Sequence, residues 1–274
     1  MLDLDYRNNN IVIPRFINYS SEENKIWKDL YSTQIKLLQN RAHEIFFEYL
    51  EQLELPIDRV PQLPDVSDIL KSKTGWVLAE VDGLISCSDF FNLLANKIFP
   101  STTYIRKLTD FSIDPDIFHE LFGHCPMLLD NRFSKFLTDL AQYAYNQPIT
   151  EQLLLLRVIW FTIEVGLVKT PEGLRIYGGA LLSSPKETIY ALEADNVERK
   201  KFNILEALRS PYRADMCQAK YFYINNLYEL FEIEINDKIF NSLKNQVIKY
   251  GEYPAKFKIE NNKYTNANIY VPPK

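Results

Sequence analysis

The 274-residue sequence contains little cysteine and little histidine, with three residues of each. Cys87, Cys125 and Cys217 lie far apart and form no CxxC pair, so their pattern argues against a disulfide scaffold. An odd number of widely spaced cysteines is typical of a reducing compartment. We therefore expect a cytoplasmic protein.

The sequence also lacks a membrane segment and an excess of basic residues. Its longest apolar stretch, 153–168, is interrupted by Arg157 and Glu164 and is shorter than the roughly 20 residues that a membrane span requires. The first residues include two acids and no apolar run typical of a signal peptide. The formal net charge is -5, whereas nucleic acids and anionic membranes attract a basic surface. We expect neither as a partner.

Hydrophobic residues make up 46% of the chain and aromatic residues 14%, a composition typical of one globular domain with a sizeable core. Apolar residues recur mostly at helical spacing. The predicted helices are 20–55, 65–72, 88–99, 131–146, 150–168 and one that begins after Ser184. Extended segments are predicted on both sides of a turn at Asp82 and Gly83, over 102–107, and in a closing hairpin over 255–274. The expected fold class is α+β, predominantly helical, with small β elements.

Two of the predicted helices begin with a capping box. Ser20 is followed three residues later by Glu23. Ser184 is followed by Pro185 at the first helical position and by Glu187 three residues after the serine. Each serine is therefore expected to cap the helix that follows it.

Two of the three histidines lie in the segment DIFHELFGHCP, five residues apart. On a regular α-helix His119 and His124 would diverge by about 140°. Both rings could bind the same metal ion only if the helix were interrupted. Gly123 offers such an interruption, because helices commonly end at glycine. The spacing is compatible with a metal ion and equally with two ordinary histidines. His43, on the first long helix, is expected to be a surface or core residue.

A third ligand is available in the apolar stretch 153–168, where Glu164 must be paired or metal-bound if it is buried. Arg157 lies seven residues away, roughly 10 Å along a helix, which makes it a distant partner. Two histidines and one carboxylate suit non-haem Fe(II) oxygen chemistry. Zinc with the same ligands, and Glu120 as the base, would suit a metallohydrolase, although the five-residue spacing departs from the His-Glu-x-x-His template.

Six motifs then carry a family resemblance: VPQLPDVS, GLISCSDFF, YIR, PDIFHELFGHCP, WFTIEVG and YGGALLSS. In this order, from about Pro14 to the end, the sequence resembles the pterin-dependent aromatic amino acid hydroxylases, most closely the single-domain bacterial phenylalanine 4-hydroxylases. The resemblance implies a monooxygenase that converts L-phenylalanine to L-tyrosine with O2 and a tetrahydropterin at an Fe(II) centre. Hydroxylation of tyrosine or tryptophan is the alternative within the family, and a zinc metallohydrolase is the alternative outside it.

The resemblance also implies roles for particular residues. The expected iron ligands are His119, His124 and Glu164. Arg106 would bind the substrate carboxylate through two parallel hydrogen bonds. The other expected substrate contacts are Ser112, Trp160 and Ser183.

The pterin site follows from the same resemblance. Phe90 is expected to stack on the pterin ring, and the loop with Leu84, Ile85 and Cys87 to bind that ring through its backbone. Glu120 is expected to face the pterin side of the metal. The wall beside it would be shaped by Pro115 and by Asp116, the latter as a hydrogen-bond partner of a ligand histidine.

Some positions depart from the family pattern. Ser112 stands where relatives commonly have threonine, and Gly179-Ala180 stands where they often have Ala-Gly. Ala214 and Cys217 occupy positions that are usually larger, so the differences are expected to enlarge the substrate pocket. Phenylalanine is still the expected substrate.

The resemblance divides the chain into an N-terminal extension, 1–13, and a catalytic domain, 14–274, that ends in the hairpin. It predicts no regulatory domain and no long C-terminal tetramerisation helix. We therefore expect a monomer or weak dimer whose partner is a small-molecule aromatic amino acid.

Overall fold

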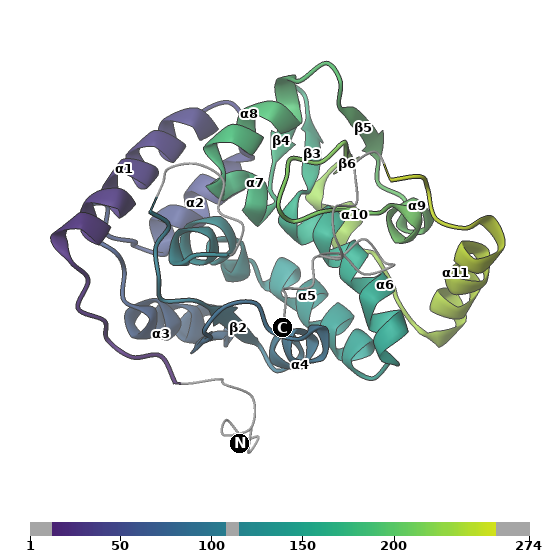
Figure 1. The fold of residues 1–274 in the computed structure, drawn as a ribbon, viewed down its shortest axis with the longest axis horizontal. Helices are drawn as coiled ribbons and strands as arrows, with labels where there is room; N and C mark the ends of the chain where they lie inside the picture. The colour runs from purple at the N-terminus through teal and green to yellow at the C-terminus, as the bar shows by residue number, and fades with distance from the viewer. Residues whose placement is uncertain (1–12, 108–114, 256–274) are drawn as a thin grey trace.

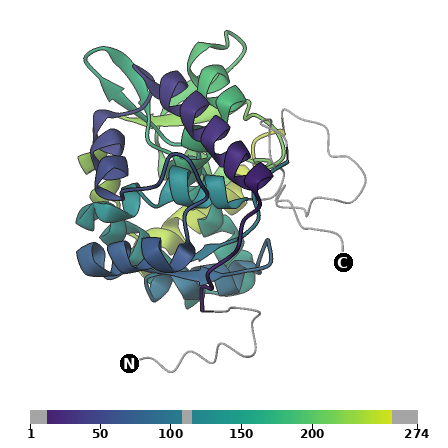
Figure 2. The same ribbon diagram turned by 90° about the vertical axis from the view of Figure 1, so that its left-hand side faces the viewer.

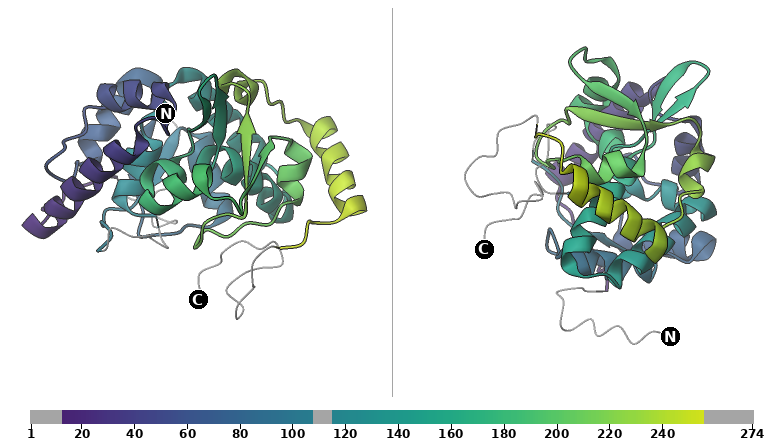
Figure 3. Two further views of the ribbon diagram at one scale, coloured as in Figure 1. Left: turned by 90° about the horizontal axis from the view of Figure 1, so that it is seen from above. Right: turned by 90° about the vertical axis from the view of Figure 1, so that its right-hand side faces the viewer.

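The structure is a computed structural model, and it describes residues 13–107 and 115–255. The helices are α1 (Ser21–Leu38), α2 (Glu44–Gln52), α3 (Leu63–Thr74), α4 (Cys87–Ala95), α5 (Asn131–Tyr145), α6 (Ile149–Ile159), α7 (Gly179–Ser183), α8 (Pro185–Glu193), α9 (Ile204–Arg209), α10 (Leu227–Phe231) and α11 (Asp237–Tyr250) (Figure 1). Two π-helical segments, η1 (His119–His124) and η3 (Trp160–Glu164), and the 3-10 turn η2 (Met127–Leu129) lie between them. The helices α1 and α11 lie at opposite ends of the molecule, as Figure 3 shows.

The strands form two small sheets. They are β1 (Val77–Glu80), β2 (Ile98–Ser101), β3 (Leu167–Thr170), β4 (Gly173–Ile176), β5 (Glu198–Lys201) and β6 (Lys220–Ile224). The pair β1-β2 is parallel, with α4 as its crossover, and the larger sheet has the order β4-β3-β6-β5. In that sheet β3 and β4 form an antiparallel hairpin, whereas β6 is parallel to both β3 and β5. The predicted α+β class with predominant helix is confirmed.

The first predicted helix is in fact two helices. The capping box of α1 is present, since Glu23 N–H donates to Ser20 Oγ at 3.2 Å and Ser20 N–H donates to Glu23 at 2.7 Å. The helix ends at Leu38, and Asn40 has a positive φ of 60°. Residues 41–43 then pair with the end of β4, and His43 caps α2, so tertiary hydrogen bonds outweigh the helical pattern. Figure 2 shows α1 crossing one side of the molecule diagonally.

Two β predictions are wrong in position. The residues directly after the turn at Gly83 do not form a strand. Residues 84–86 lead into α4, which Ser86 caps. The second strand of this sheet is β2, which precedes the predicted segment 102–107. Each residue of β2 is buried, and the periodicity of a short, fully buried apolar run does not distinguish a strand from the end of a helix. The predicted closing hairpin lies outside the described residues.

The helix predicted over 150–168 ends early, because α6 passes into η3 and then, through a turn, into β3. By contrast, α8 begins at Pro185 as predicted, and Ser184 Oγ accepts from Glu187 N–H at 3.3 Å. The glutamate side chain does not complete the box, since it binds Tyr221 instead. Among the described residues, no helix is long and apolar enough to cross a membrane.

An aromatic cluster behind η1 joins this segment to the N-terminal helices. The rings of Phe118 and Phe122 stack with centroids 4.7 Å apart. Trp27 of α1 packs edge-on against Phe118, and Phe46 of α2 packs edge-on against Phe122. Pairs of this kind contribute about 0.5–1.5 kcal/mol each beyond the burial of their area. The cluster therefore anchors η1 to α1 and α2.

Candidate metal centre and active site

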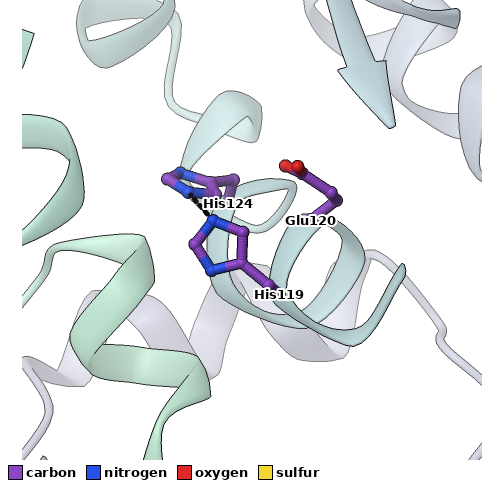
Figure 4. Close-up of side chains that lie close together, drawn as sticks. All are labelled: His119, Glu120 and His124. Atoms are coloured by element: carbon purple, nitrogen blue, oxygen red, sulfur yellow. Dashed lines mark hydrogen bonds between the residues drawn. The ribbon is translucent and has the colours of Figure 1, made fainter. Parts of the chain in front are cut away.

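A π-helical turn brings His119 and His124 together. The N–H of Cys125 donates to Glu120 O at 3.1 Å, five residues back, so this turn is wider than an α-helical turn. The imidazoles consequently lie on one face, with their Nε2 atoms 3.1 Å apart (Figure 4). The expected interruption at Gly123 is therefore wrong, since the π-helix runs through it. A Cβ at Gly123 would lie 2.5 Å from Gly179 O, so this glycine allows α7 to approach η1.

A second π-helical turn supplies Glu164. In η3 the N–H of Val165 donates to Trp160 O at 2.9 Å, again five residues back. Glu164 Oε2 lies 3.1 Å from His124 Nε2 and 3.7 Å from His119 Nε2. Arg157 donates instead to Leu208 O and pairs with a glutamate beyond α11, so it is not the partner of Glu164.

These three atoms are spaced as metal ligands would be. Ligands about 2.1 Å from a metal lie about 3.0 Å apart when they meet at a right angle and about 3.4 Å apart in a tetrahedron. Two of the observed separations are 3.1 Å, close to the right-angled value, and the third is 3.7 Å. Two imidazole nitrogens and one carboxylate oxygen can therefore hold one divalent ion from one side, which leaves positions toward the cavity.

Hydrogen bonding determines which nitrogen of His119 carries the proton. Ser183 Oγ donates to Gly179 O at 2.9 Å, so it accepts from His119 Nδ1, also at 2.9 Å. The proton then resides on Nδ1, and the Nε2 lone pair is available to a metal. Burial, with a smaller contribution from His124, lowers the pKa of His119 to about 3. The ring is neutral at physiological pH, as a ligand must be.

The two glutamates at this centre differ in the direction in which the pKa of the carboxyl group is shifted. Burial favours the neutral form of Glu164, but the adjoining His124 and His119 outweigh it and lower the pKa of this carboxyl. Burial raises the pKa of Glu120 well above its usual range, and Glu164 raises it further. Possible ligand atoms of Glu120 lie within 4.8 Å of those of the two histidines (Figure 4). Glu164 is nearer and its charged form is favoured, so it is the better third ligand, whereas burial disfavours the charged form of Glu120.

Arg106 and Asp116 form a buried ion pair next to the histidines. Asp116 Oδ2 accepts from Arg106 Nε at 2.9 Å, and Oδ1 accepts from Nη2 at 2.5 Å. Asp116 Oδ1 also accepts from the backbone N–H of His119 at 3.0 Å. Asp116 thus contacts the main chain of this histidine, while Ser183, rather than Asp116, binds its ring. The remaining terminal nitrogen of Arg106, Nη1, points toward Ser183 O at 3.4 Å.

His119 and Glu164 line a cavity of about 510 Å³, whereas His124 contacts both of them without lining its wall. Trp160 forms part of its wall and stacks on Tyr212, with ring centroids 4.4 Å apart. The other predicted residues in the wall are Leu84, Ile85, Cys87, Phe90, Arg106, Pro115, His119, Glu120, Glu164 and Ser183. Ser112 lies outside the described residues. Tyr212 and Glu187 are wall residues for which the sequence offered no signal.

The departures from the family pattern have different structural settings. Ala180 and Ala214 line the cavity, whereas Gly179 and Cys217 do not. A Cβ at Gly179 would lie 2.4 Å from the imidazole of His124, so this glycine makes room for a histidine and not for substrate. Ala180 places a methyl group in the wall where a glycine has none. The expected enlargement is therefore wrong for Gly179, Ala180 and Cys217, whereas Ala214 does line the cavity.

Comparison with known proteins agrees with this geometry. Residues 2–270 match the family described as biopterin-dependent aromatic amino acid hydroxylase. The chain is 43% identical over 224 residues to a phenylalanine-4-hydroxylase of Pseudomonas aeruginosa, covering 81% of this chain and 85% of that protein. Its fold is similar to that of a cold-active phenylalanine hydroxylase from Colwellia psychrerythraea, with a TM-score of 0.85, 42% identity and coverage of 90% and 97%. It is also similar to the Chromobacterium violaceum phenylalanine hydroxylase with bound iron(III) and 7,8-dihydrobiopterin, with a TM-score of 0.84, 35% identity and coverage of 94% and 93%.

Proposed function

The chain belongs to the biopterin-dependent aromatic amino acid hydroxylases, and from this we propose that it converts L-phenylalanine to L-tyrosine with O2 and a tetrahydropterin at an Fe(II) centre. The observation that carries the proposal is the convergence of His119, His124 and Glu164 on one point in the wall of a cavity of about 510 Å³. Iron and reduced pterin, when bound, supply the activation of O2. The residues of the chain bind, orient and shield the reactants.

His119, His124 and Glu164 would hold the iron. The proposal is supported by the separations of their ligand atoms and by the hydrogen bond from His119 Nδ1 to Ser183, which frees Nε2. Ser183 then acts mainly by positioning His119, since its hydroxyl already donates to Gly179 O. One acceptor site on Ser183 Oγ is still available to a substrate.

Arg106 would bind the carboxylate of the amino acid. Asp116 occupies Nε and Nη2, and it fixes the guanidinium so that Nη1 faces the Ser183 corner of the cavity. The stacked rings of Trp160 and Tyr212 would form the wall for the aromatic side chain. Apolar walls on both sides also exclude water from the metal face.

The pterin would bind against Phe90 and the loop with Leu84, Ile85 and Cys87. This proposal is supported by the position of these residues in the same cavity as His119. Glu120 lines the same cavity and would face the pterin side of the metal, and burial raises the pKa of its carboxyl group.

We also propose a cytoplasmic location and a monomer or weak dimer. The location is supported by the three cysteines, all of which are free thiols. Light scattering after size-exclusion chromatography would measure the assembly directly.

The deciding experiment supplies purified protein with Fe(II), a tetrahydropterin, O2 and L-phenylalanine, and measures tyrosine by mass. Reactions with Zn(II) in place of iron, and without pterin, are the controls. Tyrosine that requires both iron and pterin supports the proposal. Pterin oxidation without tyrosine would direct attention to tryptophan or tyrosine as substrate, and no turnover with iron would favour a zinc hydrolase.

A further inference from the structure

Glu187 is a buried carboxyl group in the cavity wall that the proposed chemistry does not use. It lies in the first turn of α8 and is 3% exposed, yet it lines the same cavity as Arg106 and Trp160. Its sequence position predicts a capping residue. Its side chain instead accepts a hydrogen bond from Tyr221 of β6.

The hydrogen bonds of Glu187 leave one oxygen without a partner. Tyr221 Oη donates to Oε1 at 2.5 Å, and Gln218 N–H donates to the same oxygen at 3.1 Å. No hydrogen bond from a described residue reaches Oε2. Both donors are neutral. Lys186 forms no salt bridge with Glu187 within the described part of the chain, although its charge opposes the effect of burial on the pKa of Glu187. A buried carboxylate of this kind needs a cation or a further donor.

Glu187 and Arg106 lie on either side of one corner of the chain. Arg106 Nη1 approaches Ser183 O at 3.4 Å, and the backbone N–H of Glu187 donates to Ser184 Oγ at 3.3 Å. The guanidinium of Arg106 therefore lies at the Ser183 end of this corner and the main chain of Glu187 at the Ser184 end, and both residues line the cavity. An α-amino acid presents a carboxylate and an ammonium group on a single carbon, and this arrangement is complementary to both.

The other carboxyl groups near the cavity already have neighbours that bind them or lie at the metal ligands. Asp116 is held by Arg106, and Glu164 faces the two imidazoles. Glu120 lies beside the two histidines. Glu187 is thus the carboxyl group on the Arg106 side that lacks a cationic partner among the described residues.

We propose that Glu187 binds the α-ammonium group of the amino-acid substrate while Arg106 binds its carboxylate. The inference rests on the proposed function and adds the feature that selects an amino acid over an aromatic acid without an amine. Burial raises the pKa of Glu187 to about 7, and an adjacent ammonium group would favour the ionised form.

The test compares two ligands on the iron-loaded protein, L-phenylalanine and 3-phenylpropanoate, which lacks the amine. Glu187→Gln keeps the acceptor for Tyr221 and Gln218 and removes the charge. Calorimetry should show L-phenylalanine binding about 10- to 100-fold weaker, as expected for loss of a charged hydrogen bond. The affinity for 3-phenylpropanoate should change by less than about twofold, because it makes no contact that the substitution removes.

Two variants serve as comparisons. Glu187→Asp retains the charge and should recover part of the affinity for L-phenylalanine. Glu193→Gln alters a glutamate at the end of the same helix that pairs with Arg41 on the surface, and it should bind both ligands normally. Thermal unfolding of each variant would establish that the comparison is made on folded protein.

The outcomes distinguish a failure of the role of Glu187 from a failure of the proposed enzymatic function. Equal weakening of both ligands, or none, would overturn the role of Glu187 while the unaltered enzyme still forms tyrosine. If the unaltered protein neither binds L-phenylalanine nor forms tyrosine, the proposed function itself fails, and the role of Glu187 fails with it.

Discussion

Ser183 Oγ lies 2.9 Å from Nδ1 of His119, and this hydrogen bond orients the imidazole toward His124 and Glu164. The serine belongs to α7 and the histidine to η1, two short elements that pack closely because Gly123 and Gly179 lack side chains. The orientation of the ligand His119 thus depends on α7, a helix that supplies no metal ligand itself.

Ser183→Ala should weaken iron binding and tyrosine formation by about 10- to 100-fold, as loss of a hydrogen bond to a metal-bound histidine typically does. Iron titration and steady-state turnover would measure the two effects. Ser210→Ala is a matched control, because Ser210 is buried and also donates to the carbonyl four residues back, at 2.7 Å, but lies away from the metal ligands. Equal losses in both variants would contradict a specific role for Ser183.

Glu164→Ala should abolish iron-dependent tyrosine formation and leave a folded protein. The substitution removes one of three ligands, and His124 and His119 lose the carboxylate that faces them. Metal analysis after dialysis, together with circular dichroism, would check both parts. Full coupled turnover in this variant would exclude Glu164 as a ligand.

Gly179→Ala should displace His124. The new Cβ would lie 2.4 Å from the ring, and overpacking of this kind costs about 1–3 kcal/mol. We expect a lower melting temperature and weaker iron binding, and the double variant Gly179→Ala with Ala180→Gly, the order that relatives often have, should recover both. Ala180→Gly alters the next residue of the same helix, removes a methyl group from the cavity wall and should keep the iron.

Arg106→Ala should raise the KM for L-phenylalanine strongly and also destabilise the fold. Asp116 would become a buried carboxylate without its cation, at a cost of about 3–5 kcal/mol. Urea unfolding would measure the loss. The double variant Arg106→Met with Asp116→Asn should regain stability but not substrate affinity, and failure to regain stability would contradict the unpaired-charge explanation.

Glu187 should make the stability of the apoprotein depend on pH. Burial raises its pKa in the folded state to about 7, from an ordinary value of 4.5. The folded state therefore holds a proton that the unfolded state has released, and stability falls as pH rises between these values. At 1.36 kcal/mol per pH unit, the free energy of unfolding relative to Glu187→Gln should fall by about 2–3 kcal/mol from pH 5 to pH 8. Urea unfolding of both proteins at the two pH values would measure it, and a constant difference would exclude the raised pKa.

Much of the candidate site could be predicted from residue types. His119, His124 and Glu164 are scarce residue types with metal-binding side chains in apolar surroundings, and Ser20 and Ser184 match the pattern of helix caps. These signals are local, so they do not depend on how distant segments of the chain pack together.

Other features depend on contacts between distant segments. The break before α2 follows from pairing with β4, and the parallel pairing of β1 with β2 follows from the way α4 packs. Glu187 fits a capping pattern perfectly, yet its carboxylate binds Tyr221, 34 residues away. Local spacing could not distinguish these outcomes.

The two π-helical turns, η1 and η3, make the metal centre sensitive to chain length. A π-turn holds one more residue than an α-turn between hydrogen-bonded groups, so deleting a single residue between His119 and His124 would let the segment relax to a regular α-helix. The histidines would then stand four apart, with their main chain shifted relative to Ser183 and Glu164. Insertions and deletions of one residue in these turns are thus as consequential for the centre as replacement of a ligand.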